Sequence, residues 1–361
     1  MTAPASADQP RVDLIEALRV TRTAAGARLL ADTVRENLAH LWTHGGRKDA
    51  TGTGRQPNWI WIRPQFLTGP STKTDGSVMS RLIKSRGVQL RLELLLLFDA
   101  QCRHEPGDTV TNVRRVTPHA DETYASWQQL VLTATMPTPG TDRGAADLRA
   151  RQITEAFRAL EDQHLVTIPR EPGGRRRRYN DLRLLSEAST AEEHPPYVVP
   201  SEHTFRAVPV SRHFFTSLWV FALTDTELAT YLTLCWLRTR FPGEHAKHGV
   251  YIRASDRRDT FDLTRTAWRS TARLHRFRLI DRARDPKRNY RTGNVGNISK
   301  RWANREVMPA RFTVNDEALE QPALDVIHQV LTAPTLDDHV RRLGLPVLDA
   351  PTPAGVGRAE R

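Results

Sequence analysis

The chain has 361 residues, with 53 Lys or Arg against 41 Asp or Glu, and so a formal net charge of +12. Only six of the basic residues are lysine. The guanidinium of arginine forms two parallel hydrogen bonds to a phosphate. The excess of arginine therefore favours a polyanionic partner, with nucleic acid ahead of a membrane surface. A GC-rich genome would also raise the Arg-to-Lys ratio, but it would not explain the net charge.

Other classes of protein are disfavoured by what the sequence lacks. Cys102 and Cys235 show no C-x-x-C spacing, which argues against a thiolate zinc site. The first residues have no apolar core, and the longest apolar stretch, 92–98, is too short to span a bilayer. We therefore expect a cytoplasmic protein, associated with the nucleoid or a plasmid.

An N-terminal extension of helix, strand and loops is predicted over 1–77. Apolar residues recur at helical spacing over 12–42, and a Gly-rich basic loop follows at 44–56. The stretch 58–63 alternates Trp and Ile and predicts a strand that Pro64 ends. Trp59 and Trp61 could stack on single-stranded bases, but a core strand is the favoured interpretation.

A first domain is predicted over 78–185. It opens with a strongly apolar helix around 88–102, and an irregular segment follows at 103–124. The apolar stretch at 127–136 is compatible with helix or strand. After a break at Pro137, Pro139 and Gly140, a helix-like run leads into Gly173-Gly174 and a burst of arginines, which predicts a hairpin turn.

A Pro-rich, acidic linker is predicted over 186–204, and we expect it to separate two domains that each fold alone. The second domain is predicted over 205–316. Its first helix starts with a capping box from Thr224 to Glu227, a strand is expected at 249–255, and Thr264 starts another helix. The last part, 317–361, carries a short helix at 323–331 and a tail expected to be disordered beyond about 351.

One pattern occurs in both predicted domains. A helical run ends in a leucine, a Leu-Val or Leu-Ile step follows, and a basic loop closes on a tyrosine. Leu160 and Leu165 match Leu274 and Leu279 at a constant offset of 114 residues. A helix followed by a basic β-hairpin is how a winged-helix domain grips duplex DNA, with the leucines facing the core.

The outward faces of these helices and loops supply the predicted DNA contacts. A solvated charge run is the alternative interpretation, but recurrence in the same context favours DNA. The predicted contacts are Arg151, Gln152, Arg158, Arg175, Arg176, Arg177, Arg178 and Tyr179 in the first copy, and Arg265, Arg269, Arg273, Lys287, Arg288, Tyr290 and Arg291 in the second.

Enzyme signatures are not found in the sequence. It contains no phosphate-binding loop and no H-x-H of rolling-circle initiators, and no tyrosine follows Tyr290 to serve as the late nucleophile of a tyrosine recombinase. Glu244, His245 and His248 lie close together in a predicted loop without a third ligand evident, so no metal site and no cofactor are expected. Acidic pairs, at 121–122 and at 256 with 259, leave a metal-dependent nucleic-acid enzyme open as an alternative.

The whole arrangement resembles the plasmid replication initiators with two winged-helix domains, over about 80–315. The fold implied is mainly α with small β-hairpins (α+β), with two winged helices in tandem after the N-terminal extension. The resemblance implies binding of double-stranded origin DNA by both wings and both helices, a dimer-to-monomer change, and host replication proteins as partners. The residues that match are Arg158, Arg175–Arg178, Arg269, Arg273, Lys287, Arg288 and Arg291. A transcriptional regulator with the same contacts is the alternative function.

Overall fold

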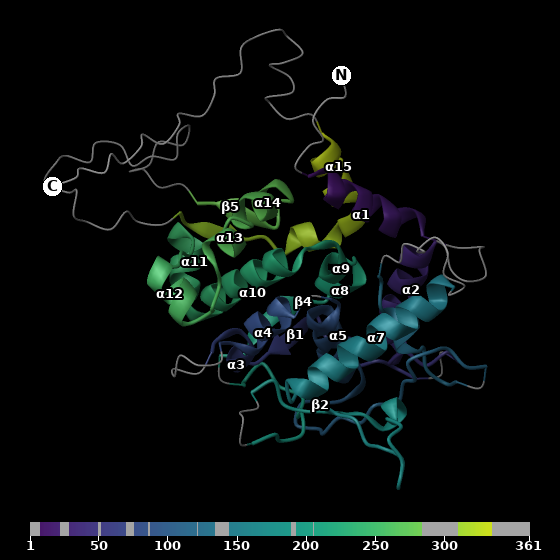
Figure 1. Ribbon diagram of the computed structural model, residues 1–361. Helices are drawn as coiled ribbons and strands as arrows, with labels where there is room; N and C mark the ends of the chain where they lie inside the picture. The colour runs from purple at the N-terminus through teal and green to yellow at the C-terminus, as the bar shows by residue number, and fades with distance from the viewer. Residues whose placement is uncertain are drawn as a thin grey trace, which may run out of the picture.

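The structure of the chain is a computed structural model. It describes residues 8–21, 29–49, 52–69, 76–85, 87–120, 122–133, 144–188, 193–204, 206–283 and 310–333. Helices dominate it, and the described strands form three two-stranded antiparallel sheets, β1-β4, β2-β3 and β5-β6. The prediction of a mainly helical α+β chain with small antiparallel sheets is therefore confirmed (Figure 1).

The described N-terminal part holds three helices and a strand. Its elements are α1 (Gln9–Val20), α2 (Leu30–His44), β1 (Trp59–Ile62) and α3 (Pro64–Leu67). The prediction of one helix over 12–42 is wrong, because Thr21 leaves the helical backbone region (ψ 127°) and its hydroxyl donates to the Ala17 carbonyl. The predicted strand is confirmed, and it ends before Pro64 as expected.

The first half continues with α4 (Val78–Lys84), α5 (Gln89–Arg103), α6 (Trp127–Leu130), α7 (Ala145–Asp162), β2 (Val166–Thr167), the 3-10 turn η1 (Tyr179–Asp181) and β3 (Arg183–Leu184). The predicted apolar helix is α5, and it is buried on nearly every side. Of the stretch predicted as helix or strand, 127–130 is a short helix that Ser126 and Gln129 start with a capping box.

The second half contains β4 (Val208–Ser211), α8 (His213–Thr216), α9 (Trp219–Ala222), α10 (Asp225–Arg240), α11 (Pro242–His248), α12 (Ala254–Asp259), α13 (Arg265–Trp268), α14 (Thr271–Arg276), β5 (Ile280–Arg282), β6 (Phe312–Val314), the 3-10 turn η3 (Glu317–Glu320) and α15 (Ala323–Thr332).

Helix starts in this half follow the sequence closely. Thr224 and Glu227 form the predicted capping box, and the Thr264 side chain accepts from the Ala267 amide. The expected strand at 249–255 is reduced to one β-bridge, between Val250 and Phe312. Residues 242–248 form α11, where a loop was predicted, because Pro242 fits the first helical turn.

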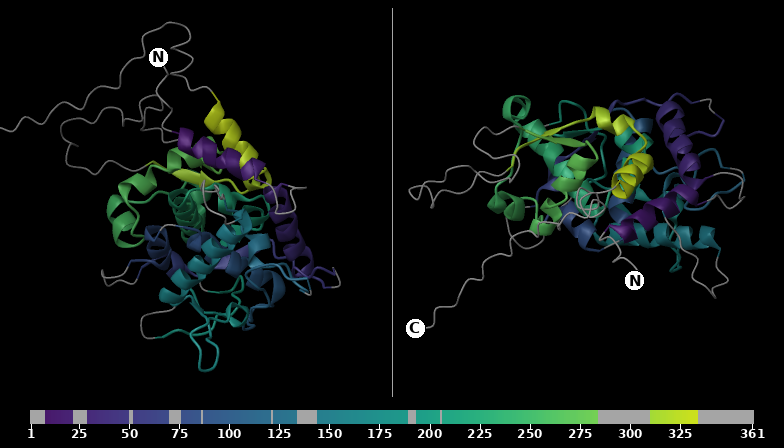
Figure 2. Two further views of the ribbon diagram at one scale, coloured as in Figure 1. Left: turned by 45° about the vertical axis from the view of Figure 1, so that its right-hand side comes forward. Right: turned by 90° about the horizontal axis from the view of Figure 1, so that it is seen from above.

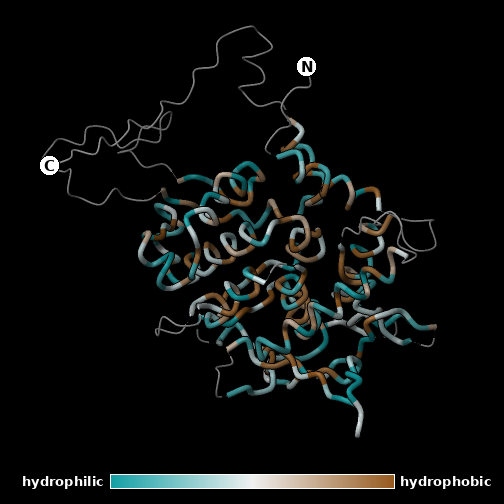
Figure 3. Tube along the Cα trace, in the orientation of Figure 1, coloured by the Kyte–Doolittle hydropathy of each residue, from teal (hydrophilic) through white to brown (hydrophobic). Residues whose placement is uncertain are grey.

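Within the described residues, one hydrophobic cluster includes side chains from the N-terminal part, from both halves and from α15. It includes Ile60 of β1, Leu97 of α5, Phe157 of α7, Leu232 of α10 and Leu279 before β5. Strand β1 pairs with β4, which lies about 150 residues later, with Ile60 opposite Val210. Apolar stretches, brown in Figure 3, gather along the central helices. The predicted domain boundaries stay a prediction, but residues on both sides of them share this core.

The predicted linker differs from an exposed tether in its described part, 186–188 and 193–204. Glu187 and Tyr197 are fully buried there, and the Tyr197 amide donates to the Leu184 carbonyl (2.9 Å). Glu187 accepts from both the amide and the guanidinium of Arg63. A Pro-rich, acidic stretch has few apolar residues to bury, but this segment buries Glu187 because Arg63 of the N-terminal extension supplies its partner.

Candidate nucleic-acid interface

The first basic hairpin, residues 166–184, forms as predicted. Strands β2 and β3 pair at its base, and Arg170 bridges Arg177 further out. The Glu171 amide donates to the Arg176 carbonyl (2.9 Å) across the turn. Gly173 has φ +69°, a backbone conformation that side-chain-bearing residues rarely adopt. The two glycines therefore allow the turn that exposes the arginine run.

Helix α7 holds this hairpin in place. The Tyr179 ring packs beside Phe157, at 6.1 Å between ring centroids, and the Arg158 Nε donates to the Tyr179 hydroxyl (3.2 Å). Glu161 accepts from the Ile168 amide (3.2 Å) and from the Arg177 Nε (2.9 Å). Tyr179, predicted as a DNA contact, is half-buried and joins the hairpin to the helix.

A cavity of about 700 Å³ opens between the hairpin, α7 and the loop before α6. Six arginines and two carboxylates line it, so its wall carries an excess of positive charge. The lining residues are Arg115, Val116, Thr117, Arg158, Glu171, Arg175, Arg176, Arg177, Arg178, Tyr179, Asn180 and Asp181. Such a wall attracts phosphate or another anion.

The four consecutive arginines are not equally available. Arg176 lies 3.8 Å from Glu171, Arg177 is bonded to Glu161, and Arg178 is paired with Asp181. Arg176 is 83% exposed and Arg178 is 50% exposed, so their ion pairs are weak in water and exchange readily for phosphate. Arg175 forms no ion pair with the described residues, which leaves it the freest cation of the run.

Helix α7 extends the basic surface beyond the cavity. Leu160 and Leu165 are buried, as the sequence predicted. Arg151 is exposed and bonded to Glu155 (2.7 Å), on the same helix face as Arg158. Gln152 is partly buried, and its Oε1 has no hydrogen-bond partner among the described residues. Arg151 and Arg158 therefore point outward from one face, while Gln152 lies nearer the core.

Arg115 is a lining residue that sequence reasoning missed. Its neighbour Arg114 is fully buried and pairs with Asp99 of α5 (2.7 Å), whereas Arg115 is 49% exposed. Burial opposes ionisation of Asp99, but Arg103 and Arg114 overcome it and hold its pKa below the usual range. No signal in the sequence tells which of two adjacent arginines is the internal partner of a distant carboxylate.

The second predicted helix is formed by α13 and α14, with Arg269 and Ser270 between them also in helical conformation. Leu274 and Leu279 are buried, as predicted, and Arg265 and Arg269 are exposed. Arg273 differs from the other two, because it is paired with Asp8 and lies 4.0 Å from Glu227. Two of the three predicted arginines on this helix are thus directed to solvent.

Further cations surround Arg265 that sequence reasoning did not name. Arg257 of α12 is buried and donates to the Leu263 carbonyl (2.7 Å). Its burial, and then the nearby charges of Arg258 and Arg265, lower its pKa. Arg258 is exposed. Helices α12 and α13 therefore form a second basic surface, which includes Arg258, Arg265 and Arg269.

The second predicted wing can be traced only at its base. Strands β5 and β6 pair antiparallel from Ile280–Val314 to Arg282–Phe312. The predicted contacts Lys287, Arg288, Tyr290 and Arg291 lie outside the described residues. The two basic surfaces are not brought together: β2 and the loop after it lie at the bottom of Figure 1, and β5, α13 and α14 at the top. The views in Figure 2 agree with this separation.

The sequence cluster of Glu244, His245 and His248 makes other contacts. Glu244 pairs with Arg311 (3.0 Å), and the Val314 amide donates to His245 Nε2 (2.8 Å). Burial, and then Arg238, lowers the pKa of His245. Within the part of the chain that the structure describes, no group of three or more His, Cys, Asp or Glu residues is placed to hold a metal ion.

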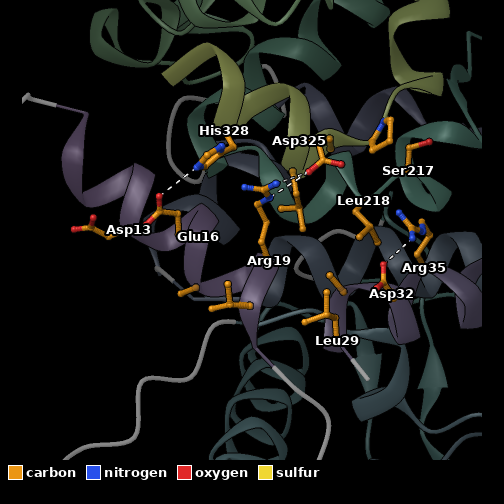
Figure 4. A pocket seen from close by; sticks show the side chains of 16 residues that line it. Asp13, Glu16, Arg19, Leu29, Asp32, Arg35, Ser217, Leu218, Asp325 and His328 are labelled. Carbon is orange, nitrogen blue, oxygen red and sulfur yellow. Dashed lines mark hydrogen bonds and ion pairs between the residues drawn. The ribbon is translucent and has the colours of Figure 1, made fainter. Parts of the chain in front are cut away.

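Another cavity, of about 960 Å³, lies between α1, α2 and α15. Most of its charged side chains pair with one another, as the dashed lines in Figure 4 show, whereas Asp13 accepts from Gln9. Glu16 contacts His328 (3.2 Å), Arg19 contacts Asp325 (3.0 Å), and Arg35 contacts Asp32 (2.6 Å). Because these charges are paired with one another, this cavity offers less free charge to a ligand. The arginine-lined cavity at the hairpin offers more.

Comparison with protein-family models, with curated proteins and with solved structures finds no match to this chain. The described helices include none with the length and apolar character needed to cross a membrane.

Proposed function

We propose that the protein binds double-stranded DNA through two winged-helix units. The observation that carries the proposal is the arginine-lined cavity, where Arg158 of α7 and the arginines of the first basic hairpin converge. In a winged helix, a basic hairpin packs at the end of a helix. The helix enters a groove of the duplex, and the hairpin contacts the flanking backbone.

The order of elements in the second half supports the same proposal. Helix α10, the bridge at Val250, helix α12, helices α13–α14, strand β5 and strand β6 occur in this order along the chain, with the short helix α11 between α10 and the bridge. Phe312 of β6 pairs with Arg282 of β5 and, through one β-bridge, with Val250, so β6 lies between β5 and the segment at Val250. Helix, strand, two helices and two strands, with the last strand in the middle, is the order of a winged helix.

The two units would contact separate stretches of duplex, since β2 and the loop after it lie at the bottom of Figure 1 and α13 lies in its upper half. This layout suits a protein that organises DNA at an origin, so we favour initiation of replication on a plasmid or mobile element. A transcriptional regulator would use the same contacts. Genomic neighbours would distinguish the two functions: an adjacent repeat array indicates replication, and a divergent promoter indicates regulation.

Selection of duplexes from a random pool, followed by footprinting, tests the proposal. The variant Arg175→Ala/Arg176→Ala should weaken binding to every duplex, because these exposed cations meet backbone phosphates. The matched control is Arg19→Ala/Arg35→Ala, which removes two arginines of the cavity in Figure 4 and should leave affinity unchanged. No selected sequence, or equal losses in both variants, would overturn the proposal.

The Arg269→Ala variant separates recognition of bases from positioning. Arg269 is exposed at the junction of α13 and α14. If it bonds a base edge, its removal should cost about 1–3 kcal/mol more on the selected sequence than on random DNA. Equal losses on both DNAs would show that Arg269 contacts only the backbone.

A further inference from the structure

Two histidines lie in the last two turns of α2, the helix at the right of Figure 1. His40 and His44 are four residues apart, and side chains at this spacing share one face of a helix. The centres of their rings are 4.8 Å apart, and the ring planes are tilted by 43°. Two histidines at this spacing on a helix are a recurring pair of zinc ligands.

The spacing of the two rings fits one shared metal ion. With a metal–nitrogen distance of about 2.1 Å and ligand angles of about 90–110°, the centres of two imidazoles on one ion lie about 4.6–5.3 Å apart. The observed 4.8 Å falls within this range. His164 and His194 offer a contrast, because their rings are stacked at 4.1 Å with planes only 15° from parallel. An ion binds in the plane of an imidazole ring, so it cannot lie in both planes of such a stack.

The ring nitrogens that an ion needs are open to solvent. Both residues are half-buried, yet neither nitrogen of His40 and not the Nε2 of His44 is enclosed, and none of the three has a hydrogen-bond partner among the described residues. His44 Nδ1 lies 3.0 Å from the Gly52 carbonyl oxygen, so Nδ1 carries the proton and Nε2 carries the lone pair. Metal-binding histidines donate their other ring N–H to a carbonyl or carboxylate in this way.

The surrounding groups keep His40 in the form that binds metal. Burial, and then the positive charges of His44 and Arg114, lower its pKa, whereas Asp49 raises it. A lowered pKa leaves the imidazole neutral, with a free lone pair, at neutral pH. Arg114 is itself paired with Asp99 (2.7 Å), which offsets its repulsion of a metal ion.

We propose that His40 and His44 bind one divalent transition-metal ion, represented by Zn²⁺, with water at its remaining positions. Imidazole nitrogen suits Zn²⁺, whereas Mg²⁺ prefers oxygen ligands. In the described part of the chain no group of three protein ligands is assembled, so the site is open and binds more weakly than a four-ligand structural zinc centre. Because His44 also holds the Gly52 carbonyl, the ion joins the end of α2 to the loop after it. The site includes none of the proposed DNA contacts, so it is tested without DNA.

The test adds Zn²⁺ to the full chain and follows the ring nitrogen signals of its 13 histidines by NMR. The buffer is held at about pH 7.5, above the ordinary pKa of histidine. The signals of His40 and His44, assigned by their loss in His40→Gln and His44→Gln, should shift together and saturate at one ion per chain. Mg²⁺ should leave both signals in place. His40→Gln should weaken Zn²⁺ binding by about 10-fold or more, because two ligands on one helix raise each other's effective concentration.

His275→Gln is the matched control. His275 also lies on a helix, and its Nδ1 is also 3.0 Å from a backbone carbonyl oxygen, that of Ile280. It makes no ring contact with a second histidine among the described residues, so its substitution should leave the affinity for Zn²⁺ unchanged.

The stacked pair, His164 and His194, is the internal control, and its signals should stay in place while those of His40 and His44 shift. Saturable, paired shifts that are lost in His40→Gln support the site. The absence of a saturable shift of these two signals at millimolar Zn²⁺ would overturn the proposal, and so would equal affinity of His40→Gln and the wild-type chain.

Discussion

The side chain of Glu93 should make the stability of the fold depend on pH. Glu93 lies on α5, is fully buried, and neither carboxylate oxygen has a hydrogen-bond partner among the described residues. Burial raises its pKa well above the ordinary value of 4.5, and the nearby Glu187 raises it further. Glu187 itself is paired with Arg63 at 2.8 Å. Both hydrogen bonds described for the Glu187 carboxylate come from Arg63, one from its amide and one from its guanidinium.

The sign follows from where the proton is held. Between about pH 4.5 and the raised pKa, the folded chain keeps a proton that the unfolded chain releases, so stability falls as pH rises. The free energy of unfolding should fall by about 1.4 kcal/mol for each pH unit in this window. Glu93→Gln removes the titration and should therefore be more stable than wild type near neutral pH.

Urea unfolding of both chains, from about pH 5 to about pH 8, measures this difference. The advantage of Glu93→Gln over wild type should grow with pH and be smallest at the acid end. Glu202→Gln is the control, because Glu202 is 70% exposed and its substitution should leave the pH profile unchanged. An advantage that stays constant over the whole range would refute the reasoning.

Three further changes probe how the parts of the chain are joined. Arg11→Met leaves Glu227 buried without its guanidinium and should lower the free energy of unfolding by about 3–5 kcal/mol; a loss below about 1 kcal/mol would contradict this. Thr224→Ala breaks the capping box of α10 and should cost about 1 kcal/mol in the same urea assay, and no change would show the cap to be redundant. Residues 78–190 and 205–316, expressed separately, should not melt cooperatively, since the cut removes β1 from β4 and divides one core; two cooperative melts would show independent domains.

Local signals in the sequence predicted local structure well. The capping box at Thr224, the turn at Gly173 and the apolar character of α5 each depend on residues a few positions apart, and the structure has all three. Their physics is complete within one turn or one hairpin, so no knowledge of the rest of the chain is needed.

Long-range partners were not predictable from the same signals. The pairing of Ile60 with Val210, and the ion pair from Arg63 to Glu187, join segments more than 100 residues apart. The Arg-rich composition hides which arginines are internal: Arg273 is paired with Asp8, while Arg269 on the same helical stretch is exposed. Each outcome depends on which carboxylate the fold brings near, and spacing along the chain carries no such information.

Salt dependence of binding to a selected duplex tests the central claim most directly. If about eight arginines meet phosphates, the logarithm of the binding constant should fall against the logarithm of salt concentration with a slope of about −7. The slope should become less steep by about 2 in Arg175→Ala/Arg176→Ala, because two phosphate contacts are lost. A slope near zero in the wild-type chain would show that its arginine-lined surfaces do not hold DNA.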